Sequence, residues 1–262
     1  MGKGLLERLG LRRKPPLALF EFRERVIEEV LRMRPDLEIE RVGEAGMKTI
    51  GGGEGNVGRG YAYYLENPQQ MDLVIRQLAD LAVYEPAAAT PESLIVLTRP
   101  ESFQVGERGS DDRGLAHDIA AGLIAVVAVD QPAGFRMATA CELRDELGMD
   151  EDAIWRRAFE NLRARIDPVP PKMERGKVTT LKTGTGLAAS VLAVEEFWRH
   201  PHFASEGDLV VCPIERDQVV VARFGDSELI QLLRRLAAGY RTSDFLCDRL
   251  LLRRNGAWEE FE

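Results

Sequence analysis

The sequence predicts an α+β protein built from two modules, the first with the order α-β-β-β-α and the second larger and mixed. Three observations lead to this prediction. Apolar residues recur at helical spacing in several stretches, short β-branched runs face each other across turn residues, and 262 residues suffice for a sizeable core. The larger module is expected to hold a mostly antiparallel sheet with helices on one face.

The first module covers residues 17–85 and begins with a helix at 19–33. Apolar residues recur there at spacings of three and four, and Pro35 stops the pattern. Two short strands are expected at 37–42 and 47–50, where the apolar period changes.

A third strand is expected at 58–65, a stretch that holds three tyrosines. Asn67-Pro68 then opens a second helix, whose broad apolar stripe runs from Met71 to Ala82. The short linker Pro86–Pro91 ends the module.

The second module covers residues 92–262. Proline stops and amphipathic periodicity mark its helices, and Asn255-Gly256 is a strong type I′ hairpin signal. In chain order we expect strands at 94–97, 122–129 and 135–139, helices at 141–147 and 150–166, a strand at 178–181, a helix at 187–198, a hairpin of 209–214 with 219–224, a helix at 227–238, and a last hairpin of 250–252 with Trp258.

Residues 1–16 form a separate N-terminal tail that ends at Pro15-Pro16. Its leucines are interleaved with lysine and arginine, the pattern of a short amphipathic helix. The tail is either a weak anchor to a membrane surface or a partner, or a frayed terminus.

Composition and charge exclude several classes of protein. The net charge of −8 and a pI near 5.2 disfavour nucleic acid as a partner, because the overall field repels phosphate backbones. The cysteines Cys141, Cys212 and Cys247 lie far apart, so they suggest neither a disulfide framework nor a zinc knuckle. No apolar run has the length of a transmembrane segment and no secretory signal is evident, which predicts a cytoplasmic protein.

The sharpest ligand-binding motif is G-x-G-x-x-A at Gly184–Ala189. It lies between an expected strand and helix, where the backbone of Gly184, Thr185 and Gly186, with Ser190 following, could cradle a phosphate. The alternative is a tight turn that only packs the helix closely. The glycine-rich stretch 51–60 lacks the Gly-Lys-Ser/Thr ending of a P-loop and is expected to be a flexible connection.

Two aromatic-basic pairs are candidate partner-binding residues. They are Trp155 with Arg156 and Trp198 with Arg199, since Trp and Arg are favoured at binding hot spots. The alternative is that the rings pack in the core and only the arginines are exposed.

The histidines give weaker signals. His200 and His202 flank a proline at an expected helix end, and no third metal ligand is specified. His117-Asp118 follows a loop with Asp111 and Asp112, which is either an acid-base or metal cluster or a solvated acidic loop. The sequence therefore predicts no metal site and no cofactor.

Several motifs in order resemble the YtpQ-like family of bacterial proteins, a domain without an assigned function. They are the runs Ala158–Arg163, Gly186–Leu192 and Gly207–Val211, with the clearest similarity between Asp118 and Gly225. The resemblance covers about residues 17–230 and implies a bacterial cytoplasmic protein, with no catalytic residue carried over. Where relatives tend to have Asp-Gly before an aromatic residue, this chain has Thr185-Gly186-Leu187.

The sequence contains no G-x-S-x-G elbow, and it specifies no base for Ser190 or for the cysteines. The leading expectation is thus a noncatalytic protein-binding or adaptor protein. The alternative is an enzyme or sensor that binds a small phosphorylated ligand at Gly184–Ser190.

Overall fold

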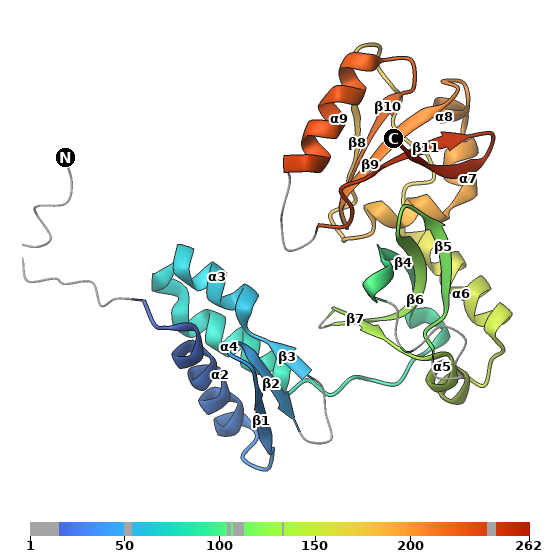
Figure 1. Cartoon of the computed structure of the whole chain (residues 1–262). Helices are drawn as coiled ribbons and strands as arrows, with labels where there is room; N and C mark the ends of the chain where they lie inside the picture. Colours follow the sequence, from blue (N-terminus) through green and yellow to red (C-terminus); the bar gives the residue numbers. More distant parts are fainter. Residues whose placement is uncertain (1–15, 50–53, 104–105, 107–112, 133, 240–244) are drawn as a thin grey trace, which may run out of the picture. The chain divides into compact units, whose positions relative to one another are not determined.

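The computed structural model describes residues 16–49, 54–103, 106, 113–132, 134–239 and 245–262 (Figure 1). The α+β class is confirmed, with antiparallel sheets and several helices. The chain divides into two compact units, unit 1 (Met1–Glu85) and unit 2 (Pro86–Glu262). The tail predicted at residues 1–16 lies outside the described residues, except for Pro16.

Unit 1 packs helices against one small antiparallel sheet. Helix α2 (Leu19–Met33) is followed by β1 (Ile39–Val42), β2 (Gly46–Thr49) and β3 (Glu54–Asn56), which lie in the order β1-β2-β3. Then come α3 (Gly58–Glu66), the short 3₁₀ helix η1 (Pro68–Gln70) and α4 (Met71–Ala82). Helix α2 packs against α4, and their apolar stripes form the core with β2 (Figure 1).

The strand predicted at 58–65 is wrong, because this stretch is helix α3 and the third strand is β3. Tyrosine is common in strands. Here, however, Val57 and Tyr64 lie about two helical turns apart and are both buried, as expected for one face of a helix. Tyr64 stacks on Phe22 of α2 at 5.3 Å between ring centroids. Gly60 lets α3 approach α4, since a Cβ there would lie 2.6 Å from Leu78 Cδ1.

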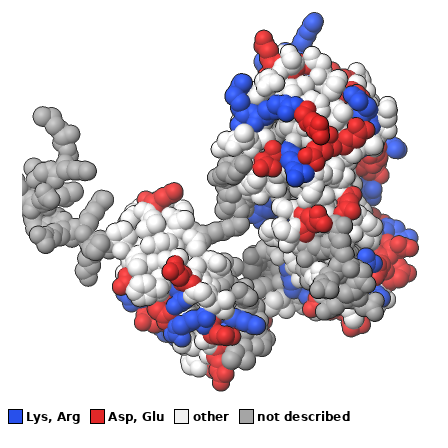
Figure 2. Space-filling view, viewed as in Figure 1, with Lys and Arg blue, Asp and Glu red and all other residues white. Residues whose placement is uncertain are grey.

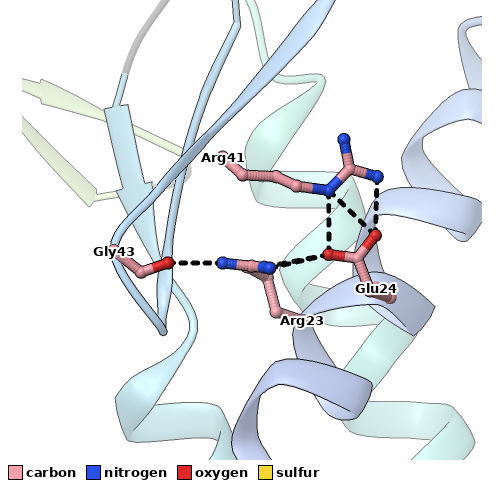
Figure 3. A network of polar contacts seen from close by, with 4 residues as sticks. All are labelled: Arg23, Glu24, Arg41 and Gly43. Atoms are coloured by element: carbon pink, nitrogen blue, oxygen red, sulfur yellow. Dashed lines mark hydrogen bonds and ion pairs between the residues drawn. The ribbon is translucent and has the colours of Figure 1, made fainter.

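A polar network ties the β1–β2 turn to α2 (Figure 3). The buried Arg23 donates from Nη1 to the carbonyl of Gly43 at 2.5 Å and from Nη2 to Glu24 at 2.8 Å. Arg41 on β1 donates to the same carboxylate at 2.6 Å. Hydrogen bonds and charges of both arginines lower the pKa of Glu24, with Arg41 the larger cause. The turn is thus held in place by charge-assisted hydrogen bonds.

The first sheet of unit 2 is four-stranded and antiparallel. Its strands are β4 (Leu94–Pro100), β5 (Ala116–Ala120), β6 (Leu123–Gln131) and β7 (Gly134–Met137), with the order β4-β6-β5 and β7 paired to β6. The sequence did not predict β5. Two helices follow it in the chain, α5 (Ala140–Leu147) and α6 (Glu151–Arg165), and α6 packs against β4. The side chains of Thr139 and Asp150 cap their N-termini.

The second sheet of unit 2 has five antiparallel strands in the order β12-β11-β9-β10-β8. One face packs against α9 (Ser227–Gly239), where Leu233 is fully buried, and the opposite face joins the core that includes the four-stranded sheet. The strands are β8 (Thr179–Leu181), β9 (Leu209–Glu215), β10 (Gln218–Arg223), β11 (Leu250–Arg254) and β12 (Ala257–Phe261) (Figure 1).

Strand β9 carries a proline although it lies inside the sheet. Its first six residues, Leu209–Ile214, are all buried. β11 pairs with β9 only at Leu209, Val210 and Val211, so Pro213 lies beyond that ladder and its missing N–H breaks no bond to β11. The pairing with β10 also shifts register between Gln218 and Val219, close to Pro213.

Two hairpins of unit 2 use two-residue turns with positive φ. Asn255 (φ 50°) and Gly256 (φ 81°) join β11 to β12, which confirms the type I′ prediction. Ala121 (φ 52°) and Gly122 (φ 75°) join β5 to β6 in the same way. An alanine in the left-handed region is strained, because its Cβ crowds the following carbonyl.

The helix predicted at 187–198 is interrupted. It consists of the 3₁₀ helix η4 (Ala188–Ala193) and the short helix α7 (Glu195–Arg199), and α8 (Pro201–Ala204) follows. Val194 between the first two is extended (φ −105°, ψ 94°). Helix η4 packs against β4 and β10, so tertiary packing overrides the helical apolar spacing of this stretch.

Candidate functional site

The predicted phosphate turn is organised around the chain's own carboxylate. Asp217, in the β9–β10 hairpin, accepts hydrogen bonds from the backbone N–H groups of Thr183 (3.1 Å), Gly184 (2.7 Å) and Gly186 (3.1 Å). The hydroxyl of Thr183 donates to it as well. Gly184 and Gly186 have positive φ, which turns their N–H groups toward one point.

The pKa of Asp217 reflects this arrangement. Burial raises the pKa, but the hydrogen bonds from Thr183 and Gly184 outweigh burial, so the pKa lies below its ordinary value of 3.8. The carboxylate is therefore ionised at neutral pH and fills the position that a phosphate would take. This geometry favours a structural turn, which was the alternative interpretation of the motif.

Ser190 does not take part in this turn, because its side chain contacts β4 instead. It lies in η4, is 1% exposed, and its hydroxyl accepts from the N–H of Thr98 on β4 at 3.3 Å. Thr185 is exposed and its hydroxyl donates to that of Thr183 at 2.9 Å. The structure thus gathers Gly184, Thr185 and Gly186 in one turn and buries Ser190 beside the edge of β4.

The second aromatic-basic pair is split between core and surface. Trp198 is 4% exposed, donates from Nε1 to the carbonyl of Val191 at 2.7 Å, and meets Trp258 edge-on at 4.9 Å. Arg199 is exposed and pairs with Glu195 at 2.8 Å. This ring packs in the core, as the alternative interpretation has it, and is not presented to a partner.

The first pair belongs to a row of stacked rings on the surface of unit 2. Trp155 on α6 stacks on His117 of β5, with 4.3 Å between centroids and 25° between planes. Trp155 also stacks with Phe159, with 5.7 Å between the ring centroids. The guanidinium of Arg163 lies 5.7 Å from the Phe159 centroid and pairs with Glu196 at 3.0 Å.

Helix geometry explains how α6 presents this row. Trp155, Phe159 and Arg163 follow each other at intervals of four, so they form one stripe along the helix. Ile154, Ala158 and Leu162, one position earlier in each case, are fully buried. The two rings are half-buried and border the core, whereas His117 and Arg163 are exposed.

Arg156 adds a charge beside the row. At about 100° per residue, Arg156 lies on the solvent side of Trp155. Arg163, about two turns later, points in nearly the same direction as Arg156. Arg156 is exposed and forms no ion pair within the described part of the chain. We call the set His117, Trp155, Arg156, Phe159 and Arg163 the α6 aromatic surface.

Three members of this surface, His117, Trp155 and Arg156, could be singled out in the sequence. The sequence did not show that they lie close together. The sequence places His117 directly after a loop but does not predict the strand β5 on which it lies, and it does not single out Phe159. The spacing of four between Trp155 and Phe159 was the available signal. Asp111 and Asp112, expected near His117, lie outside the described residues.

The two other histidines make local contacts. His200 Nδ1 accepts from the N–H of His202 at 3.2 Å and so caps α8, and His202 Nδ1 lies 2.7 Å from the carbonyl of Pro170. In the residues that the structure describes, no group of three or more histidine, cysteine or acidic side chains is arranged to hold a metal. Nor is any helix among them long and apolar enough to span a bilayer.

Unit 1 has a groove between α2 and α4, but its charges balance. Three arginines and three acidic residues face it, and Arg32 and Glu29 pair within it at 2.5 Å. Such a groove has no excess charge to attract an ionic ligand. Its lining residues are Arg25, Glu28, Glu29, Arg32, Asp72, Ile75 and Arg76.

Comparison with protein-family models, with curated proteins and with solved structures found no match to this chain.

Proposed function

We propose that the protein is a noncatalytic protein-binding or adaptor protein whose partner docks on the α6 aromatic surface. The observation that carries the proposal is the stack of His117, Trp155 and Phe159. Trp155 and Phe159 are half-buried in it, and His117 is exposed. Stacked rings give a large, rigid apolar contact at low entropic cost, and Trp and Arg dominate binding hot spots.

The chemistry of the surface indicates the kind of protein segment it would take. The rings favour an apolar or aromatic anchor. The guanidinium of Arg156, which has no ion pair among the described residues, favours a carboxylate next to that anchor. We therefore propose an acidic partner segment with an exposed apolar side chain. By contrast, nothing at Gly184–Gly186 favours a phosphorylated ligand, because Asp217 already occupies that turn.

We also propose that the protein is bacterial and cytoplasmic. This rests on the resemblance to the YtpQ-like family between Asp118 and Gly225, a stretch that includes most of the α6 aromatic surface.

Site-directed photo-crosslinking tests the proposed function. A photoreactive phenylalanine analogue replaces Asp152, an exposed residue one turn before Arg156 on α6, in the full chain, and the protein is irradiated in cells of its source organism. The matched control places the same analogue at Arg235, an exposed position on α9. We expect one protein to be crosslinked from position 152 and not from position 235.

A second variant ties the crosslink to the rings. Trp155→Ala, combined with the probe at 152, should remove the crosslink while the melting temperature shows that unit 2 is still folded. The proposal is wrong if position 152 captures nothing, or if it captures the same proteins as position 235. It is equally wrong if Trp155→Ala leaves the crosslink unchanged in a folded protein.

A further inference from the structure

Unit 1 presents a face with few charges over α3. Figure 2 shows charged side chains gathered over α2 and the strands of unit 1, while the region over α3 is mostly uncharged. Leu65 on α3 is 44% exposed. Large apolar side chains that remain in water in this way often mark a contact surface.

The N-terminal tail enters unit 1 at this face. The N–H of Leu17 donates to the Tyr64 hydroxyl at 2.9 Å, and the Tyr61 hydroxyl donates to the carbonyl of Leu17 at 2.8 Å. Two side chains of α3 thus fix the point from which residues 1–15 extend. Leu65 follows Tyr61 by four residues and lies on the same side of α3.

The composition of the tail complements that of unit 1. Residues 1–15 contain four leucines, five basic residues and one acidic residue, whereas residues 17–85 contain 13 acidic and eight basic residues. Fifteen residues span about 22 Å even as a helix, which is ample for a patch beside their own attachment point. Because the tail is tethered there, its effective concentration is high and a small patch suffices.

We propose that residues 1–15 dock on unit 1 itself, with their leucines over an exit patch formed by Leu17, Tyr61 and Leu65. The tail would then cover apolar surface that is otherwise in water, and its positive charge would face an acidic unit. Docking makes the leucines of the tail unavailable to other surfaces for as long as it lasts.

Trypsin cleavage of the full-length protein tests this proposal, since the tail offers cleavage sites at Arg8, Arg12 and Arg13. When undocking is fast, the cleavage rate follows the undocked fraction. We expect Leu65→Ser and Leu65→Asn each to raise the rate about tenfold, the factor given by 1.4 kcal/mol. Leu31→Ser is the matched control, because Leu31 is 37% exposed on α2 but lies about 18 Å along the helix from its first residue, Leu19.

A reciprocal variant avoids any change to unit 1. Leu5→Ser combined with Leu6→Ser should raise cleavage at Arg12 and Arg13 to the same extent, with an unchanged melting temperature. Equal rates in the wild type, the patch variants and the tail variant would overturn the proposal, as would an equal increase with Leu31→Ser.

Two further measurements distinguish other binding sites for the tail. If cleavage of the wild type slows with rising protein concentration, the tail docks on a second copy and the intramolecular proposal fails. If only phosphatidylglycerol vesicles protect the tail, and they protect Leu65→Ser equally, the tail binds a membrane surface and the proposal fails as well.

Discussion

The hydroxyl of Thr183 donates a hydrogen bond to the carboxylate of Asp217, 34 positions later in the chain. This contact joins the loop after β8 to the β9–β10 hairpin, and the N–H groups of Gly184 and Gly186 converge on the same carboxylate. Backbone N–H groups arranged in this way make an anion site. In this protein the anion comes from its own side chain, so the loop is a clamp between two parts of the five-stranded sheet.

Replacing Asp217 should therefore destabilise unit 2. We expect Asp217→Asn to lower the free energy of unfolding by about 1–3 kcal/mol, because an amide cannot accept all of these hydrogen bonds and its NH₂ group opposes the N–H donors. Urea denaturation measures the difference. Glu259→Gln is the control, since Glu259 is exposed on β12 and should change stability by less than about 0.5 kcal/mol. Equal effects would show that the cradle adds nothing.

The same carboxylate should make stability depend on acid. The pKa of Asp217 is lower in the folded protein than its ordinary value of 3.8, so its contribution is fully present above that value. It is lost as the pH falls through the lower folded pKa. We expect the stability difference between wild type and Asp217→Asn to be constant between about pH 5 and 8 and to shrink below pH 3.8. A difference that instead grows in acid would refute this assignment.

Two arginines share the carboxylate of Glu195, and their variants should differ sharply. The Arg253 side chain is 9% exposed, and its guanidinium lies 5.0 Å from the Trp258 centroid. Arg199 is 76% exposed. We expect Arg253→Ala to reduce stability by about 2–4 kcal/mol and Arg199→Ala by at most about 0.5 kcal/mol. Thermal unfolding of both variants checks this, and similar losses would contradict it.

The buried hydroxyl of Thr98 should be dispensable. Thr98 is fully buried, and its Oγ1 has no hydrogen-bond partner within the described residues. We expect Thr98→Val to stabilise the protein by about 1 kcal/mol, since it removes an unsatisfied polar group without changing the shape. Thr139→Val, which removes the hydroxyl that caps α5, should destabilise by about 1 kcal/mol. Chemical denaturation compares the pair, and a loss with Thr98→Val would mean that its hydroxyl is satisfied in solution.

The two type I′ turns allow a paired test of backbone strain. Ala121 has φ 52° and Asn255 has φ 50°, but only asparagine tolerates this region well. We expect Ala121→Asn to stabilise the protein by about 1 kcal/mol and Asn255→Ala to destabilise it by a similar amount. The bond from the Cys247 thiol to the carbonyl of Ala121 uses only backbone at position 121 and is retained. Shifts of the same sign in the two variants would exclude strain as the cause.

Elements defined by local signals could be predicted from the sequence. Helix α6 has a capping Asp150 and a clean apolar stripe, and the hairpin at Asn255 has its own turn code. Elements defined by distant partners could not. β5 reads Ala-His-Asp-Ile-Ala, which has little β signal, and it becomes a strand because β6 offers an edge to pair with. Tyr61 and Tyr64 favour strand by propensity but pack as a helix on α2.

The candidate site shows the same division. The spacing of Trp155 and Phe159 could be seen in the sequence, yet the ring that completes the stack, His117, lies 38 positions before Trp155 on the strand that was not predicted. The glycines at 184 and 186 indicated an anion-binding turn, but the anion belongs to Asp217, which no local pattern connects with them.

Pro213 has a consequence for the unfolded chain. The run Leu209–Ile214 is uncharged and rich in branched side chains, and in the native sheet all six residues are buried. Exposed during synthesis or thermal unfolding, such a segment is a template for cross-β stacking between chains. A proline within it cannot donate to an intermolecular ladder, so each stacked copy would lack a hydrogen bond at that position. Pro213, which the native sheet accommodates beside a register shift, should thus also oppose aggregation of the unfolded chain.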